Sequence, residues 1–275
     1  MEILVVEGNP ERLSAPLRAL GGVPYGESYA RCLEKLSPRI SCSIVHPCED
    51  GLDCLARGRA LSDYAGIVIT GSGLSCCDEN SDVLNQVRFA EKAFVSERPV
   101  FGSCWGLQVM ARALGGKVRR NPKGREFSIG YDIVLTEAGR AHPMYTGIES
   151  PFAALAVHAD EVESLPAGWT VLAGNGMSAV QAAAIQQGNS TFWGVQYHPE
   201  FSWSDMAVTA RQLAPQLIKE GFYTDEASLL ERTRKMAGLD DCPQIVSDDL
   251  SIPHSLLNPV NRQRELANWV HTILI

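Results

Sequence analysis

The chain has 275 residues, of which 45% are hydrophobic and 20% are charged, so it can build a full core without disulfides or metals. Its formal net charge of −8 argues against a nucleic-acid partner. No apolar run is long enough to span a membrane, and the N-terminus lacks the basic segment of a secretory signal. We therefore expect a cytoplasmic protein with no membrane segment.

The eight cysteines are typical of reduced thiols rather than of a metal site. No two of them form a C-x-x-C pair, and the spacing of Cys42, Cys48 and Cys54 does not match the usual zinc ligands. Without an export signal, disulfides are not expected either. We predict no metal and no cofactor.

Strand and helix patterns alternate in the first part of the chain, and residues 8–26 between them are predicted to be a long loop. This alternation predicts an α/β fold with a mixed, mostly parallel sheet flanked by helices. Asp82 or Ser81 is the expected cap of the second helix. The predicted strands are 2–6, 40–45, 66–70 and 99–102, and the predicted helices are 27–36, 82–96 and 105–114.

The pattern becomes richer in strands after residue 117, and a helix returns at 204–220. We predict one domain over residues 1–221 and a helical C-terminal extension over 222–275. The extension contains a helix at 225–237, a polar, turn-rich stretch at 239–254 and an apolar stripe in 258–275. We expect the stripe to pack against the domain; a homodimer contact or a docking face for a partner are the alternatives. The predicted strands are 129–135, 152–157, 169–173, 179–186 and 191–197, and the stripe consists of Leu266, Trp269, Val270, Ile273 and Leu274.

Cys104 stands in the strongest local motif, Pro-Val-Phe-Gly-Ser-Cys-Trp-Gly-Leu-Gln, over residues 99–108. A buried strand runs into Gly-x-Cys-x-Gly and then into a helix, which is the sequence form of a nucleophile elbow. Such a turn places the sulfur at a helix N-terminus, where the backbone dipole favours a thiolate. A buried structural cysteine beside packing glycines is the alternative.

His198 and Glu200 follow an apolar strand in the segment Gln-Tyr-His-Pro-Glu. Pro199 favours extended backbone at His198, and residues i and i+2 of an extended segment point the same way. A carboxylate beside an imidazole fixes its tautomer and stabilises the imidazolium. The pair is therefore a candidate base and its orienting carboxylate. A capping histidine beside a solvated glutamate is the alternative.

A glycine loop, Gly71-Ser72-Gly73, follows the strand at 66–70. Glycines let backbone N–H groups face a bound oxygen, as an oxyanion hole requires. An ordinary turn between a strand and a helix would have the same composition. No GxxxxGK[ST] pattern is present, so a phosphate-binding P-loop is excluded.

In this order, the glycine loop, Gly-x-Cys-x-Gly-x-Gln and His-Pro-Glu resemble the class I (triad) glutamine amidotransferases. The resemblance covers roughly residues 1–220 and implies the flavodoxin-like fold of that family. It implies that Cys104 is the nucleophile, His198 the general base and acid, and Glu200 the orienting carboxylate. It also implies oxyanion donors from the Trp105 N–H and from the loop Gly71-Ser72-Gly73.

The same resemblance implies further substrate contacts. Gln108 matches a family residue that contacts the substrate glutamine. Gly130-Tyr131 resembles the substrate-side strand of the GMP synthetase glutaminase subgroup, and the segment from His158 resembles a His-Gly-Asp-x-Val segment of that subgroup. We expect His158 to be a hydrogen-bonded structural histidine. Trp105, Leu107 and Ser72 depart from the residues frequent in the family, which leaves the triad intact.

The resemblance implies hydrolysis of the glutamine side-chain amide through a thioester, giving glutamate and ammonia for a separate acceptor subunit. No ATP-pyrophosphatase motif is present, so a complete GMP synthetase is not expected. A hydrolase or peptidase acting on other γ-glutamyl amides has the same triad and is the first alternative. A catalytically silent binding or regulatory subunit is the second.

Overall fold

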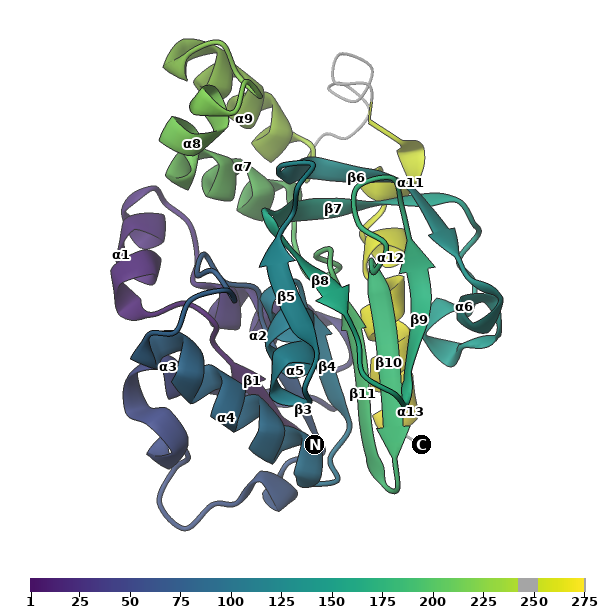
Figure 1. Cartoon of the computed structure of the whole chain (residues 1–275). Coiled ribbons are helices and arrows are strands. Elements are labelled where there is room, and N and C mark those ends of the chain that lie inside the picture. Colours follow the sequence, from purple (N-terminus) through teal and green to yellow (C-terminus); the bar gives the residue numbers. More distant parts are fainter. Residues whose placement is uncertain (242–251, 275) are drawn as a thin grey trace.

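The protein is described here by a computed structural model, which covers residues 1–241 and 252–274. A nine-stranded mixed sheet forms its centre, in the order β2-β1-β3-β4-β11-β10-β9-β6-β7 (Figure 1). The strands of this sheet are β1 (Glu2–Val6), β2 (Ser41–Val45), β3 (Gly66–Ile69), β4 (Val100–Ser103), β6 (Glu126–Leu135), β7 (Phe152–His158), β9 (Trp169–Gly174), β10 (Ala182–Gln187) and β11 (Ser190–Val195). A second, antiparallel sheet pairs β5 (Lys117–Arg120) with β8 (Asp160–Ser164).

Five neighbouring strands, β2, β1, β3, β4 and β11, run parallel. Their carboxyl ends therefore lie along one edge of the sheet, where ligands of open α/β sheets bind. The segments that leave this edge begin at Glu7, Thr70, Cys104 and Gln196. This topology brings together the three motifs found in the sequence.

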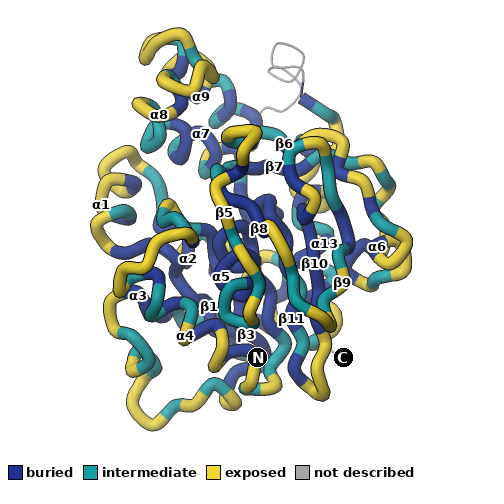
Figure 2. Tube along the Cα trace, in the orientation of Figure 1, coloured by how far each residue is buried: buried dark blue, intermediate teal, exposed yellow. Residues whose placement is uncertain are grey.

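Helices cover both faces of the parallel strands, and the central strands β3 and β4 are buried along their whole length (Figure 2). On one face lie α2 (Tyr25–Leu36) and α13 (Arg264–Leu274), whose core includes Ile3 and Val5. On the other face lie α4 (Ser81–Val95) and α5 (Trp105–Ala113), whose core includes Leu4 and Val6. Because β1 is buried on both sides, its sequence is a continuous apolar run.

A third group of helices projects beyond the carboxyl edge of the sheet and is seen at the upper left of Figure 1. Leu229 and Met236 of α9 pack in one core with Met206 and Ala210 of α7. This group includes α7 (Trp203–Gln212), α8 (Ala214–Lys219) and α9 (Glu226–Gly238), with α1 (Glu11–Ala19) beside it. The remaining described helices are short: the α-helices are α3 (Pro47–Asp50), α6 (Glu137–Ala141), α11 (His254–Leu257) and α12 (Pro259–Arg262), and the 3-10 helices are η1 (Gly51–Asp53), η2 (Leu61–Asp63) and η3 (Pro143–Tyr145).

The predicted fold class is confirmed, whereas several details of the elements are corrected. The predicted loop 8–26 contains helix α1. Its internal Pro16 is a residue that disfavours helix, which is why the sequence pattern predicts a loop there. Helix α4 begins at Ser81 and is capped by Asn80, whose side chain accepts the Val83 N–H, so neither predicted cap is right. The predicted helix 204–220 divides into α7 and α8, because Pro215 has no N–H to continue the first helix. Strands β5 and β8 were not predicted.

The apolar stripe near the C-terminus packs against the sheet, as predicted. Leu266, Trp269 and Val270 share a core with Val68 and Phe101, and Ile273 and Leu274 lie against it. A Cβ added at Gly66 would lie 2.9 Å from the Trp269 ring, so the glycine makes room for the indole. The domain boundary at residue 221 stays a prediction, and most of the predicted turn-rich stretch 239–254 lies outside the described residues.

Among the residues that the structure describes, no helix has the length and apolar character to cross a membrane.

Truncation of Trp269 tests the importance of this packing. Trp269→Ala is expected to lower the free energy of unfolding by about 3–5 kcal/mol, because it leaves a cavity between α13 and β3. Urea denaturation followed by circular dichroism measures the change. Val260→Ala, at a residue of α12 that is 59% exposed, should cost less than about 0.5 kcal/mol. Equal effects of the two substitutions would contradict a core role for the indole.

Candidate active site

Cys104 occupies a sharp turn between β4 and α5. Its backbone has φ 51° and ψ −99°, a conformation that is strained for a residue with a side chain. A Cβ at Gly102 would lie 2.6 Å from the Gly106 carbonyl carbon, and one at Gly106 would collide with the Ile69 carbonyl oxygen. The glycines on both sides of the cysteine are therefore required by close backbone contact, as the motif predicts.

His198 and Glu200 form a buried hydrogen-bonded pair next to this turn. Nδ1 of His198 lies 2.8 Å from Oε1 of Glu200, and both side chains are 2% exposed. The imidazole stacks on Phe201 at 4.1 Å between ring centroids, and the His198 N–H donates to the Leu155 carbonyl. Glu200, Phe201 and the Leu155 carbonyl thus fix the position of the His198 ring and backbone.

The remaining ring nitrogen of His198 faces Cys104. Nε2 is buried and makes no hydrogen bond of good geometry with any described residue, and the polar side chain beside it is that of Cys104. Cys104 is itself 4% exposed. The structure therefore brings the cysteine, the histidine and the glutamate together in the order that a triad requires.

The protonation of His198 is set by two opposing effects. Burial disfavours its positive charge, but the Glu200 carboxylate and the neighbouring Cys104 outweigh burial and raise the pKa of His198 to about 10. The imidazole is thereby a strong acceptor for a proton from its neighbour.

The glycine loop after β3 lies directly against His198. A Cβ at Gly71 would lie 2.6 Å from Cε1 of His198, so only glycine fits at this position. The side chain of Asn9 fixes the loop, since its Oδ1 accepts the Gly73 N–H at 2.8 Å and the Ser72 hydroxyl at 3.1 Å. The Gly73 N–H is therefore already engaged within the loop and is not a free donor.

Asn9 was not found by the sequence analysis, nor was its support by Glu7. The buried Glu7 carboxylate accepts the backbone N–H of Asn9 at 2.9 Å and that of Gly26 at 2.6 Å. Burial raises the pKa of Glu7 to about 7. The sequence did contain a signal for these residues: both are polar and closely follow the buried strand 2–6. The carboxyl end of a parallel strand is where such folds place their binding sites.

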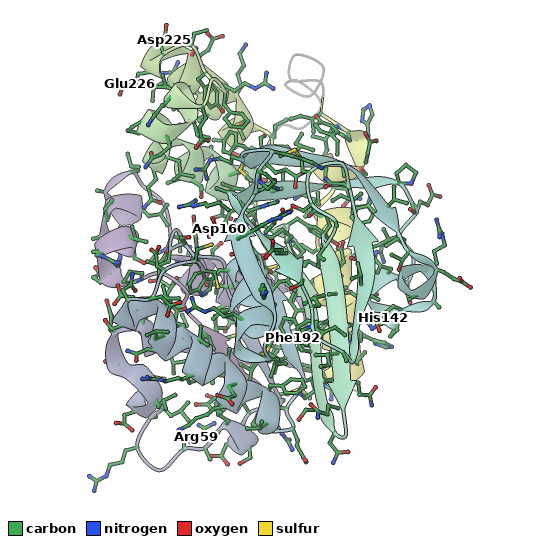
Figure 3. The ribbon with its side chains drawn as sticks, in the orientation of Figure 1. Arg59, His142, Asp160, Phe192, Asp225 and Glu226 are labelled. Carbon is green, nitrogen blue, oxygen red and sulfur yellow. The ribbon has the colours of Figure 1, made fainter. Side chains whose placement is uncertain are left out.

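A cavity of about 320 Å³ opens beside Cys104. Gln108 lines it, and its Nε2 donates to the Asp160 carbonyl at 3.0 Å and to Oε1 of Gln196 at 3.1 Å. Asp160, labelled in Figure 3, belongs to β8, the strand that sequence analysis missed. The residues around the cavity are Asn9, Leu13, Tyr25, Ser72, Gly73, Leu74, Ser75, Cys104, Gln108, Arg120, Arg125, Val157, His158, Ala159, Asp160, His198, Thr209, Gln212, Leu213 and Gln216.

Gly130 and Tyr131 do not line this cavity, in contrast to the expectation from the subgroup resemblance. The register of β6 against β7 shifts between Gly130 and Ile133, and Asp132 has φ 51°. This irregularity turns Tyr131 outward, where it is 49% exposed. A Cβ at Gly130 would instead lie 3.1 Å from Glu126.

His158 is a buried, hydrogen-bonded residue at the cavity wall, as expected. Its Nδ1 lies 3.0 Å from the Asp160 carbonyl and its Nε2 lies 2.8 Å from Oε2 of Glu126. Burial works against the charge of Glu126, yet the hydrogen bond from His158 holds the pKa of Glu126 below its usual value. Both ring nitrogens are engaged, so His158 orders β6, β7 and β8 around the site.

The family model described as "Glutamine amidotransferase class-I" matches residues 24–212, which include Cys104, His198 and Glu200. The chain belongs to this family. It is an amide hydrolase of the cysteine-nucleophile type.

This glutamine amidotransferase is similar to proteins with different activities. It is 37% identical over 227 residues to the γ-glutamyl-L-1-hydroxyisopropylamide hydrolase of a Pseudomonas species, covering 81% of this chain and 75% of that protein. It is 31% identical to γ-glutamyl peptidase 4 of Arabidopsis thaliana, covering 62% and 68%. Identity to a glutamine-hydrolysing GMP synthase subunit of Methanoculleus marisnigri is 38%, but over 38% of this chain and 53% of that one.

A solved structure supports the fold of the amidotransferase. The glutamine amidotransferase of Thermotoga maritima matches with a TM-score of 0.67 over 100% of this chain and 98% of that one. At 17% sequence identity, this match establishes the fold alone. Among the described residues, no cluster of histidine, cysteine and acidic side chains could hold a metal ion.

Gly71→Ala tests how the glycine loop positions the amidotransferase histidine. The added methyl group should displace the His198 ring and lower kcat/KM for amide hydrolysis at least about 100-fold, because small misplacements of reacting groups are costly. Thermal denaturation checks that the variant folds.

Gly73→Ala is the matched control in the same loop. Its Cβ would meet the Leu13 side chain at 3.2 Å and no group of the triad. We expect it to keep activity within about tenfold of the parent. A Gly73 variant as impaired as the Gly71 variant would show that general loop strain, rather than contact with His198, lowers activity.

Glu200→Gln tests the electrostatics of the pair. Removing the carboxylate removes the largest effect that raises the pKa of His198, and burial then favours the neutral imidazole. Ring ¹⁵N shifts should show a protonated His198 in the parent from neutral pH up to about pH 10, and a titration at lower pH in the variant. Glu163→Gln, at an exposed carboxylate paired with Arg119, should leave the titration unchanged. Identical curves for Glu200→Gln and the parent would refute the pairing.

Proposed function

We propose that this amidotransferase hydrolyses γ-glutamyl amides whose nitrogen carries an organic substituent, giving glutamate and a free amine. The observation that supports the proposal is the extent of the cavity beside Cys104. Its lining includes Gln108 and Asp160 on one side and a second wall on the other, formed by residues of helices α1, α2, α7 and α8. Ammonia as a leaving group needs no such wall. The similarity to a γ-glutamyl-alkylamide hydrolase and a γ-glutamyl peptidase supports the same reading.

Cys104, His198 and Glu200 are assigned the covalent chemistry. The proton shared by the Cys104–His198 pair resides on Nε2 of His198, and the sulfur forms a bond to the γ-carbonyl carbon as the carbonyl π electrons move to the oxygen. His198 then gives the proton to the amide nitrogen, the carbon–nitrogen bond breaks, and an amine leaves behind a thioester. Water, activated by the same imidazole, hydrolyses the thioester to glutamate and regenerates the thiol. Glu200 holds Nδ1 so that Nε2 faces the sulfur throughout.

The oxyanion of the tetrahedral intermediate needs two backbone donors. Trp105 is the first residue of α5, where a backbone N–H has no acceptor within the helix. The second donor is assigned to the loop at Gly71 and Ser72, because the Gly73 N–H is bound to Asn9. Removal of one such donor in other enzymes costs about 3–4 kcal/mol of transition-state stabilisation.

The glutamyl half of the substrate is assigned to the wall around Asp160. Its Oδ2 accepts the Ser75 hydroxyl at 2.7 Å, and its buried Oδ1 makes no hydrogen bond of good geometry with a described residue, although Arg120 lies 3.2 Å away. A carboxylate and a guanidinium side by side are complementary to the α-ammonium and α-carboxylate of a γ-glutamyl group. Gln108 is placed to contact the same group.

The leaving amine is assigned to the helical wall. The Tyr25 hydroxyl lies 3.3 Å from the Thr209 hydroxyl, and burial raises the pKa of Tyr25, which keeps it a donor. Leu13 and Leu213 add apolar surface beside this hydroxyl pair. Such a mixture suits a short aliphatic amine that carries a hydroxyl or a carbonyl group.

Ammonia supply to a separate synthase is the second candidate, favoured by the similarity to the GMP synthase subunit. The substrates of the two candidate reactions share the γ-glutamyl group and differ only in the substituent on the scissile nitrogen. They are therefore separated by the leaving group that the enzyme prefers.

A substrate panel tests the proposal. Glutamate release is measured from glutamine, from γ-glutamyl hydroxyisopropylamide and from a γ-glutamyl dipeptide, and aspartate release is measured from the matching β-aspartyl amide. We expect kcat/KM for a substituted γ-glutamyl amide to exceed that for glutamine by at least about tenfold, since the filled wall contributes binding energy in the transition state. Cys104→Ala should abolish all turnover, and Cys77→Ala, at an exposed cysteine, should abolish none.

Two results would overturn the proposal. Slow, Cys104-dependent hydrolysis of glutamine alone would favour an ammonia donor for a synthase. Absence of any turnover, with no labelling of Cys104 by a glutamine-like electrophile, would favour a silent binding subunit.

A further inference from the structure

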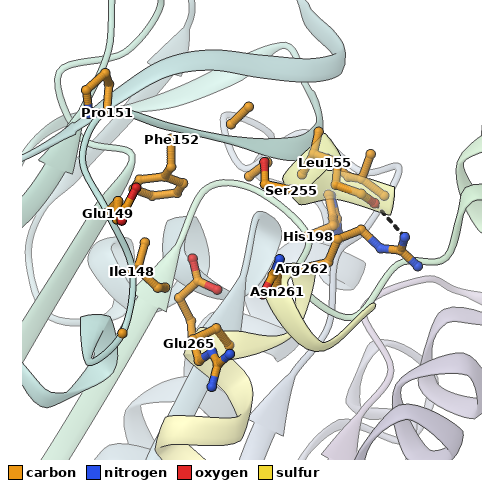
Figure 4. Close-up of a pocket in the computed structure, with 15 residues that line it drawn as sticks. Ile148, Glu149, Pro151, Phe152, Leu155, His198, Ser255, Asn261, Arg262 and Glu265 are labelled. Atoms are coloured by element: carbon orange, nitrogen blue, oxygen red, sulfur yellow. Dashed lines mark hydrogen bonds between the residues drawn. The ribbon is translucent and has the colours of Figure 1, made fainter. Parts of the chain in front are cut away.

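A second cavity, of about 350 Å³, lies between the start of β7 and the C-terminal helices α11, α12 and α13 (Figure 4). One wall is apolar, formed by Ile148, Phe152, Ala154 and Leu155. The other wall carries the polar and charged residues of the C-terminal helices. His198 lines this cavity as well as the catalytic one, so the two sites meet at the same residue.

Glu265 is the chemically distinctive group of this cavity. It is 3% exposed, and Figure 4 shows its carboxyl group pointing into the space between Ile148, Phe152 and Asn261. Oε1 accepts the Tyr197 hydroxyl at 2.7 Å, which is the one side-chain hydrogen bond to this carboxylate among the described residues. Burial raises the pKa of Glu265 to about 7, since little nearby compensates its negative charge.

The cations near Glu265 are not paired with it. Arg262 points away from Glu265 in Figure 4 and donates to the Leu256 carbonyl, with Asp240 3.5 Å from its guanidinium. Arg264 is half-buried at the wall and forms no ion pair with Glu265 within the described part of the chain, although its charge works against the raised pKa of Glu265. Glu149 adds a second carboxylate at the exposed rim. The cavity thus offers a buried carboxylate without a cation.

We propose that this cavity binds a small protonated alkylamine, with the ammonium group on Glu265 and the alkyl body against Phe152 and Ile148. An ammonium group completes the hydrogen bonding of a buried carboxylate. The face of the Phe152 ring attracts a cation as well as an alkyl chain. Asn261 and Ser255 at the wall accept further N–H or O–H groups of the ligand.

The position of the cavity connects such a ligand with catalysis. Tyr197, which donates to Glu265, immediately precedes His198 in the chain. The hydrolysis proposed above releases an amine of the same class, so the enzyme's own product is a natural occupant; this last step rests on the proposed function. The proposal that this cavity binds an alkylamine does not depend on the proposed function.

The test measures binding without turnover. Full-length protein carrying Cys104→Ala is titrated at about pH 8 with isobutylamine, with the neutral isobutanol and with the anionic isovalerate, by calorimetry and by ¹⁵N-resolved NMR. We expect isobutylamine to bind at least about tenfold more tightly than either analogue. The shifted amide signals should belong to residues 147–155 and 261–265.

Two substitutions in the same background assign the site. Glu265→Gln keeps an acceptor for Tyr197 but removes the charge, and should weaken isobutylamine at least about tenfold. Asp160→Asn, at a carboxylate of the catalytic cavity, should leave its affinity unchanged. Equal binding of isobutanol, preference for isovalerate, shifts centred on Asp160 or no binding of the amine would each overturn the proposal. None of these results depends on whether the enzyme hydrolyses γ-glutamyl amides.

Discussion

The strained backbone of Cys104 is the constraint on which the site depends. A positive φ at a residue with a side chain persists only where the surroundings enforce it. Here β4 and β11 fix one side of the turn, through the bond from the Cys104 N–H to the Val195 carbonyl at 2.7 Å. Gly102 and Gly106 let the strand, the helix and β3 approach closely on the other side. The sulfur is thereby presented at the sheet edge without reliance on a flexible loop.

The second half of the machinery comes from a segment that has no regular structure of its own. His198 and Glu200 follow β11, and their geometry is set by neighbours: Leu155 on the backbone, Phe201 on one ring face and Gly71 beside Cε1. Each contact comes from a different element. The arrangement of Cys104, His198 and Glu200 therefore depends on the correct assembly of β3, β4, β7 and β11.

Much of this arrangement could be predicted from the sequence, because the relevant signals are local. Strand periodicity, the glycines around Cys104 and the i, i+2 relation of His198 and Glu200 all act within a few residues. What the sequence did not reveal depends on long-range contacts. Asn9 acts on a loop more than sixty residues away in the sequence. The two-stranded sheet that carries Asp160 lacks the alternation of apolar and polar residues that predicts a strand.

Two errors have physical causes of the same kind. Helix α1 was missed because Pro16 is unfavourable inside a helix, a local preference that the surrounding fold overrides. Tyr131 was assigned to the substrate side because a strand was assumed to be regular, whereas β6 shifts register next to it and turns the ring outward. Neither tertiary packing nor a bulge can be read from spacing alone.

The position of Trp269 has a consequence for how the protein folds during its synthesis. Its indole fills the space over Gly66 and lies 5.8 Å from the ring of Phe101, so residues near the end of the chain complete a core begun by the earliest strands. A chain emerging from the ribosome has α2 to cover part of this face, but the part over Gly66 and Phe101 stays uncovered until α13 appears. Premature termination anywhere before that helix leaves an open sheet face, and such a product is a substrate for chaperones and proteases rather than a smaller enzyme.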